Sequence, residues 1–113
     1  MIRRAMEEGT CVTSGAITIR TVRVDDASIS RVTFGVGACW SEDIGRATGA
    51  VLCPRPHLAL ITHGRLRVRM YDGKEDSFSV GDVMQLPPGH DVWTEGEEPC
   101  VFVEFAIQGE TTA

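Results

Sequence analysis

Short apolar runs separated by glycine- and proline-containing turns are the strongest constraint on how this chain folds. Twelve glycines are spread along the 113 residues and divide the chain into short apolar segments. Within these segments apolar and polar residues alternate, as where Ile17 and Ile19 alternate with Thr18 and Arg20. Period-two alternation is typical of a strand with one buried face. The sequence therefore predicts an all-β chain with about nine short strands.

The turn signals between these segments favour antiparallel pairing. Asp72-Gly73 predicts a tight hairpin, because such turns need a positive φ at both central positions. Parallel strands would need longer crossover connections than this chain offers. The stretch 37–56 is rich in glycine and proline and predicts an irregular loop, with room for one short strand at 50–53. The remaining strands are expected at 16–24, 32–36, 57–62, 65–71, 78–80, 83–86, 90–94 and 101–107.

The length fits one domain, with no repeat or linker. We expect a barrel over 16–108, a polar segment over 1–15 that is either loose or packed on a partner subunit, and a tail over 109–113. A formal net charge of −5 gives no electrostatic reason to bind nucleic acid or an anionic membrane.

No signal sequence and no membrane-length apolar stretch is expected, so we predict a cytoplasmic protein. Its four cysteines are then interpreted as reduced thiols rather than disulfides.

A basic cluster is formed by Arg65, Arg67 and Arg69. Their spacing of two places them on one face of a strand. We interpret this face as solvated, with a subunit contact or an anionic-substrate site as the alternative.

Two stretches resemble the signature motifs of the cupin superfamily. The segment from Gly81 to Gly89 resembles the opening of the second motif, and the apolar strand from Leu58 to Gly64 resembles the end of the first. The resemblance covers about 34–107 and implies a jelly-roll barrel, the antiparallel double-stranded β-helix of that family. It also implies a ligand-sized interior and pairing into a homodimer through a sheet, for which the apolar run 58–61 offers a surface.

A narrower resemblance is to a group of small single-domain cupins. It is carried by the Cys53-Pro-Arg-Pro-His57 segment and by Pro87-Pro-Gly-His90-Asp-Val-Trp93. It supports the fold more than any particular activity, since one fold hosts many functions.

Metal-binding cupins use two histidines and a glutamate from the first motif, and this chain departs from that set. Counting back from Gly64, the glutamate position holds His57, and the second-histidine and first-histidine positions fall on Cys53 and Val51. In the second motif the histidine position holds Val92, but His90 precedes it by two residues.

The resemblance thus implies Cys53, His57 and His90 as candidate metal ligands. Thiolate and imidazole both bind Zn²⁺ or Fe²⁺, and three such ligands leave an open position for water or substrate. Each residue also has a plainer interpretation. Cys53 fits a small buried side chain, His57 a hydrogen-bonded residue at a strand start, and His90 a cap after the turn.

Three functions follow from these alternatives: a metal-binding cupin with a small molecule in the barrel, a metal-free small-molecule binding or sensing module, and a structural dimerisation domain. Whether the protein is an enzyme stays open at this point. Four carboxylates near the expected barrel mouth are candidate general bases with nothing to single one out: Glu42, Asp43, Asp91 and Glu95.

Overall fold

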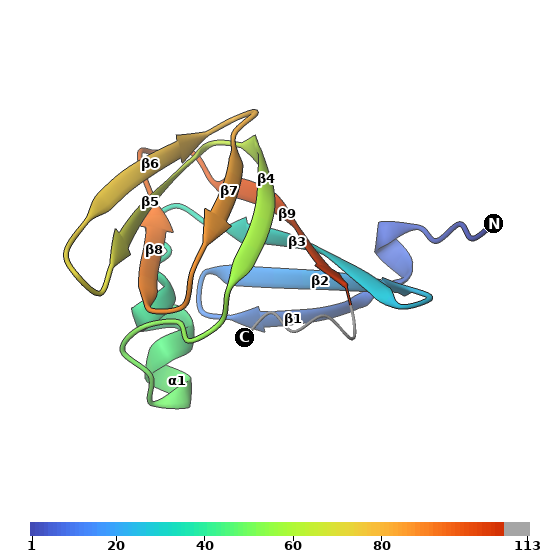
Figure 1. The fold of residues 1–113 in the computed structure, drawn as a ribbon, viewed down its shortest axis with the longest axis horizontal. Helices are drawn as coiled ribbons and strands as arrows, with labels where there is room; N and C mark the ends of the chain where they lie inside the picture. Colours follow the sequence, from blue (N-terminus) through green and yellow to red (C-terminus); the bar gives the residue numbers. More distant parts are fainter. Residues whose placement is uncertain (108–113) are drawn as a thin grey trace.

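Two antiparallel sheets face each other in the computed structural model, which describes residues 1–107 (Figure 1). The larger sheet has the strand order β1-β2-β3-β9-β4-β7, and the smaller has the order β6-β5-β8. The described residues contain nine strands, as the alternation predicts: β1 (Thr10–Ser14), β2 (Ile17–Val24), β3 (Ala27–Phe34), β4 (His57–His63), β5 (Arg65–Met70), β6 (Glu75–Ser79), β7 (Val83–Leu86), β8 (His90–Thr94) and β9 (Cys100–Ile107).

The core lies between the two sheets. Phe34 of β3 and Phe102 of β9 pack with their ring centroids 5.7 Å apart. Because successive side chains of a strand point to opposite faces, the inward position of Phe102 turns the alternating Val101, Val103 and Phe105 outward. The other buried apolar side chains of this core are Ile17, Val32, Ala38, Ala59, Ile61, Leu66, Val68, Met84, Leu86, Val92 and Cys100.

The stretch 37–56 is helical in its middle, where the sequence predicts an irregular loop. A π-helical turn covers Ser41–Gly45, and α1 covers Arg46–Thr48, at the end of the barrel where β8 begins (Figure 1). The Asp91 carboxylate accepts a hydrogen bond from the Ser41 backbone N–H at 3.0 Å, which anchors the first helical turn. The short strand for which 50–53 offered room does not form, because within that stretch only Cys53 makes an isolated bridge, to His90.

The larger sheet begins before the boundary expected at residue 16. β1 pairs with β2 along its whole length, from Thr10 opposite Thr21 to Ser14 opposite Ile17. A short 3-10 helix over Met6–Glu8 precedes it. Residues 10–14 thus belong to the sheet, while the tail predicted over 109–113, like residue 108, lies outside the described residues. Within residues 1–107, no helix is long and apolar enough to cross a membrane.

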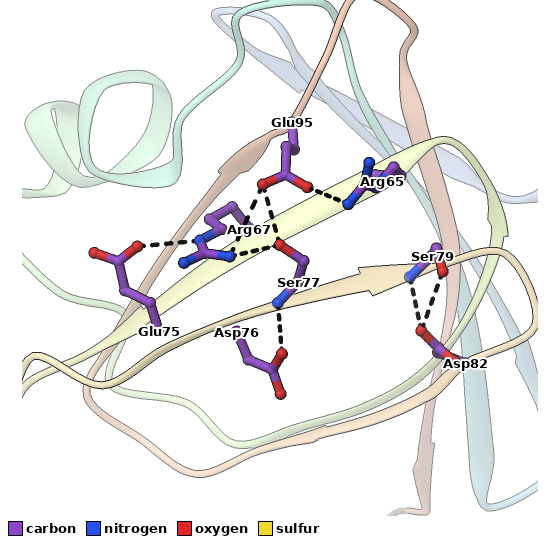
Figure 2. Close-up of polar contacts among 8 residues, drawn as sticks. All are labelled: Arg65, Arg67, Glu75, Asp76, Ser77, Ser79, Asp82 and Glu95. Carbon is purple, nitrogen blue, oxygen red and sulfur yellow. Dashed lines mark hydrogen bonds and ion pairs between the residues drawn. The ribbon is translucent and has the colours of Figure 1, made fainter.

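The arginines of β5 alternate with the buried Leu66 and Val68 and so lie on the outer face of the smaller sheet. Acidic side chains meet Arg65 and Arg67 there (Figure 2). Arg67 Nε lies 3.0 Å from Glu75 Oε1, and Arg65 lies 3.0 Å from Glu95 Oε1. Arg69 stacks over the ring of Trp93, with its guanidinium carbon 6.0 Å from the ring centroid. These contacts fit the predicted solvated face and leave little unbalanced positive charge for an anionic substrate.

Candidate metal centre

Three side chains from separate parts of the chain meet at one end of the barrel. Cys53 lies in the loop before β4, His57 is the first residue of β4, and His90 is the first residue of β8. A backbone bridge joins the two segments, with Cys53 N–H donating to the His90 carbonyl and Gly89 N–H donating to the Cys53 carbonyl, both at 2.8 Å. One ligand atom from each of the three side chains lies within 4.8 Å of the others. The structure therefore brings together all three residues that the sequence singles out.

The spacing of these atoms is close to that of ligands on one metal ion. Cys53 Sγ lies 3.3 Å from His57 Nε2. Donors at tetrahedral zinc distances are about 3.5 Å apart. The His57 and His90 rings meet edge to face, with centroids 5.0 Å apart and an angle of 68°. Cys53 and His90 are buried, and His57 is partly exposed.

Both imidazoles are held through the nitrogen that faces away from the thiol. His57 Nδ1 contacts the Glu104 carboxylate, and His90 Nδ1 donates to the Pro87 carbonyl at 2.6 Å. His57 presents its Nε2 to the Cys53 sulfur, and the His90 ring also forms a hydrogen bond to Cys53. An acceptor on Nδ1 is the usual partner of a metal-binding histidine, because it fixes the tautomer and the ring orientation.

Sequence reasoning missed Glu104. The apolar alternation of β9 runs through Val101, Val103 and Phe105, and it gives no reason to expect the residues between them in the interior. Phe102 and Glu104 form the inward set instead, and Glu104 lines the interior cavity. A lone carboxylate within an otherwise apolar strand is the signal that could have found it, since a buried charge needs a partner.

The same contacts determine how the thiol and the imidazole ionise. Burial alone would raise the pKa of Cys53, but hydrogen bonds from His57 and His90 overcome it and lower the pKa to about 6. Burial alone would lower the pKa of His57, but hydrogen bonds to Cys53 and Glu104 raise the pKa to about 9. At neutral pH the metal-free site therefore holds a thiolate beside an imidazolium. By contrast, burial raises the pKa of Cys100 to about 11.

The remaining motif positions do not join the centre. Val51 is 79% exposed, so the first-histidine position points into solvent. Val92 faces the interior on the same side of β8 as His90, as the alternation predicts, and lines the cavity. His63 is exposed at the far end of β4, so it has no place at this centre.

The candidate general bases are engaged in structural contacts, apart from Glu42, which is exposed. The Asp43 carboxylate accepts a hydrogen bond from Cys39 N–H at 2.9 Å. Asp91 accepts from the Ser41 N–H and hydroxyl, and Glu95 pairs with Arg65. None of these contacts directs a carboxylate toward the thiol and imidazoles.

Two adjoining hollows reach the centre. An apolar cavity of about 60 Å³ lies inside the barrel, and a groove of about 710 Å³ opens at its mouth. Five residues line both: Ile19, Trp40, Ile44, His57 and Glu104. A ligand in the groove would therefore contact the same histidine and carboxylate that form the candidate centre.

The donor set fits a resident transition metal. A thiolate and two imidazoles suit Zn²⁺ or Fe²⁺, whereas Mn²⁺ prefers oxygen ligands. Three protein ligands leave a fourth position open, as in catalytic zinc sites. The Nδ1 contacts supply the outer ring of hydrogen bonds that such ligands need.

No protein-family model matches the chain, and no curated protein is similar enough in sequence to count as a relative. Solved structures are similar in fold. A mutant of oxalate decarboxylase from Bacillus subtilis superposes with a TM-score of 0.69 at 20% identity, over 93% of this chain. A sugar phosphate isomerase from a cupin superfamily, from Silicibacter pomeroyi, has a TM-score of 0.69 at 14% identity, over 95% of this chain. This chain has the cupin fold.

These likenesses establish the architecture of this chain, and its chemistry has to come from its own residues. The chain spans only 29% of the Bacillus subtilis oxalate decarboxylase chain and 32% of the oxalate decarboxylase from Lactobacillus farciminis, to which it has a TM-score of 0.68 at 15% identity. It spans 76% of the Silicibacter pomeroyi protein. The Bacillus enzyme is described with Mn(II) centres.

Proposed function

We propose that this cupin binds one divalent transition-metal ion, Zn²⁺ or Fe²⁺, through Cys53, His57 and His90, and offers the open coordination position to a small molecule in the barrel. One observation carries the proposal. The Nδ1 atoms of both histidines are already held by acceptors, so both Nε2 atoms face the same thiol. Histidines that serve only as caps have no need of this arrangement.

A bound ion would act as a Lewis acid toward a ligand oxygen or nitrogen. The chain's own residues have separate tasks. Glu104 orients His57 and holds the proton on Nδ1, and the Pro87 carbonyl does the same for His90. The apolar lining of the cavity excludes bulk water and strengthens the electrostatic interactions at the centre.

The first test is the metal content of protein purified without a histidine tag, measured by elemental analysis. Wild type is expected to carry close to one equivalent of zinc or iron, and His57→Ala to lose most of it. His63→Ala is the matched control, because His63 is an exposed histidine of the same strand and lies outside the centre. The proposal would be refuted if wild type contained no metal and its thermal stability did not change when Zn²⁺ or Fe²⁺ was added.

A metal-free binding module is the second candidate, and one observation favours it. Cys53, His57 and Glu104 already satisfy one another in the metal-free site, as a thiolate, an imidazolium and a carboxylate in contact. In that case a small organic ligand occupies the barrel, and its affinity is unchanged by a strong chelator. Chelator-sensitive ligand binding would exclude this candidate.

We also propose that the protein is a homodimer through the outer face of the larger sheet. Leu60 of β4 lies opposite Val83 of β7 and opposite Val103 of β9. Leu58, Leu60, Val83 and Phe105 are 47%, 36%, 67% and 45% exposed. An apolar patch that spans three neighbouring strands is typical of a subunit contact, because exposure of apolar side chains to water is unfavourable. If the protein served mainly as a dimerisation domain, its function would depend on this face rather than on Cys53, His57 and His90.

Light scattering over a range of protein concentrations tests the dimer. Wild type is expected to be dimeric and Leu60→Glu monomeric. Val12→Glu serves as the control, since Val12 is 62% exposed but lies on β1, the opposite edge strand of the sheet from β7. A monomeric wild type at all concentrations would refute the contact.

A cytoplasmic location fits the proposed chemistry. Cys53 can ligate a metal only as a reduced thiol, and reducing compartments keep thiols in that form. Secretion of the protein with its cysteines oxidised would contradict this placement.

A further inference from the structure

The groove at the barrel mouth contains a positively charged side chain that the proposed metal site does not use. The groove volume of about 710 Å³ lies within the range of roughly 300–1,000 Å³ that is usual for small-molecule sites. Arg55 lines it beside Cys53 and His57. This arginine is the residue between the two prolines of the Cys53–His57 segment.

Arg55 differs from the arginines of β5 in having no protein partner for its charge. Among residues 1–107, no ion pair or hydrogen bond engages the Arg55 guanidinium, whereas Arg65 and Arg67 are paired with glutamates. An unpaired guanidinium beside a groove is free to bind an anion in a two-point contact, and its planar fork matches a carboxylate.

The backbone around Arg55 is constrained. Pro54 and Pro56 restrict it on both sides, since a proline fixes its own φ and keeps the preceding residue extended. The Cys53 sulfur lies 3.9 Å from the Arg55 carbonyl oxygen, within the same short segment. The segment that carries the guanidinium is therefore tied to the candidate metal ligand itself.

The groove lining carries one exposed cation, Arg55, and one carboxylate, Glu104, which is already in contact with His57. Arg55 therefore offers a single positive charge to a ligand. A monocarboxylate matches that charge, whereas a phosphate monoester, with close to two negative charges, exceeds it. The groove walls also include Ile19, Trp40 and Ile44, which suit an apolar body.

We propose that the small molecule bound by this cupin is an organic monocarboxylate with an apolar body, and that Arg55 binds its carboxylate. The inference rests on the proposed small-molecule site, but the recognition by Arg55 does not depend on the metal. The apolar body lies on Trp40 and Ile44, which places the molecule against His57 and Glu104.

The test compares matched ligands on zinc-loaded and zinc-free protein by calorimetry. The probes are phenylacetate and hexanoate, each against its primary amide, with phenyl phosphate as the dianionic comparison. Each acid is expected to bind at least about tenfold more tightly than its amide, because a charged hydrogen-bonded pair replaces a neutral one. Arg55→Gln should remove this difference, and Arg55→Lys should keep part of it. Arg46→Gln should change nothing, since Arg46 is an exposed arginine outside the groove.

The outcomes separate this inference from the metal proposal, because zinc affinity is measured independently by competition with a chromophoric chelator. Zinc-binding protein with no preference for the acids, or with a preference that survives Arg55→Gln, overturns the inference alone. Failure of every probe to bind, or tighter binding of phenyl phosphate, overturns it as well. Protein that binds no zinc but still prefers the acids through Arg55 supports the inference and removes the metal.

Discussion

Zinc binding to this protein should depend on pH through His57. In the metal-free protein the pKa of His57 is about 9, so below that pH its Nε2 carries a proton that a metal must displace. The pKa of Cys53 is about 6, so above pH 7 the thiol has already lost its proton. Between pH 7 and 8.5 loading should release one proton, and the affinity for Zn²⁺ should rise about tenfold per pH unit.

The size of the effect follows from the two pKa values. At pH 7 the His57 pKa lies about two units above the solution pH, so proton competition costs about 2.7 kcal/mol, a factor of about 100 in affinity. Above about pH 9 the affinity should level off, because His57 is then neutral before the metal arrives. Below about pH 6 the dependence should steepen, because Cys53 must lose a proton as well.

Calorimetry at pH 7.5 in two buffers of different ionisation enthalpy measures the proton release directly. Glu104→Gln is the informative variant, since it removes the carboxylate that raises the His57 pKa. The variant should release less than one proton and should lose about 10- to 100-fold in zinc affinity at high pH, the usual cost of losing an outer partner of a ligand. A release near zero or near two protons in wild type would refute the assigned ionisation states.

Three further predictions concern stability, each measured by urea denaturation. Gly64→Ala should destabilise the fold by about 2 kcal/mol or more, because φ is +70° and a Cβ would lie 2.2 Å from the Pro99 carbonyl oxygen. Gly73 has a φ of +88° but no atom within 4 Å of an added Cβ, so Gly73→Ala should destabilise the fold by only about 1 kcal/mol. Phe34→Ala should cost about 3–5 kcal/mol, because this ring is 2% exposed in the core. Asp91→Ala should cost roughly 1–3 kcal/mol, because it leaves the Ser41 N–H and hydroxyl without their acceptor. Equal effects at the two glycines, or losses below about 1 kcal/mol at Phe34 or Asp91, would contradict the packing described.

The candidate ligands could be named before the structure because the resemblance to the cupin motifs aligns short local segments. Cys53 and His57 lie four residues apart at the start of a predicted strand, and His90 follows the Pro-Pro-Gly turn. Their meeting depends on the backbone bridge between Cys53 and His90, which is a contact between segments far apart in the chain. The resemblance named the residues, and only the fold could bring them together.

The sequence could not predict the helix in 37–56 or the pairing of β1, for a related reason. The π-helical turn over Ser41–Gly45 is held by Asp91, a residue of a distant strand. Its own residues lack a strong helical pattern. β1 has mostly exposed side chains, so its sequence carries little alternation, and its place comes from hydrogen bonding to β2.

The sequence by itself determined the all-β class and most of the strands, because alternation and turn residues act over a few neighbouring positions. The resemblance to cupin motifs added the expectation of a barrel. Only the tertiary structure decided which face of β9 is inside, because alternation defines two faces without saying which one meets the core. That decision places Glu104 against His57 and leaves the Phe105 side chain 45% exposed.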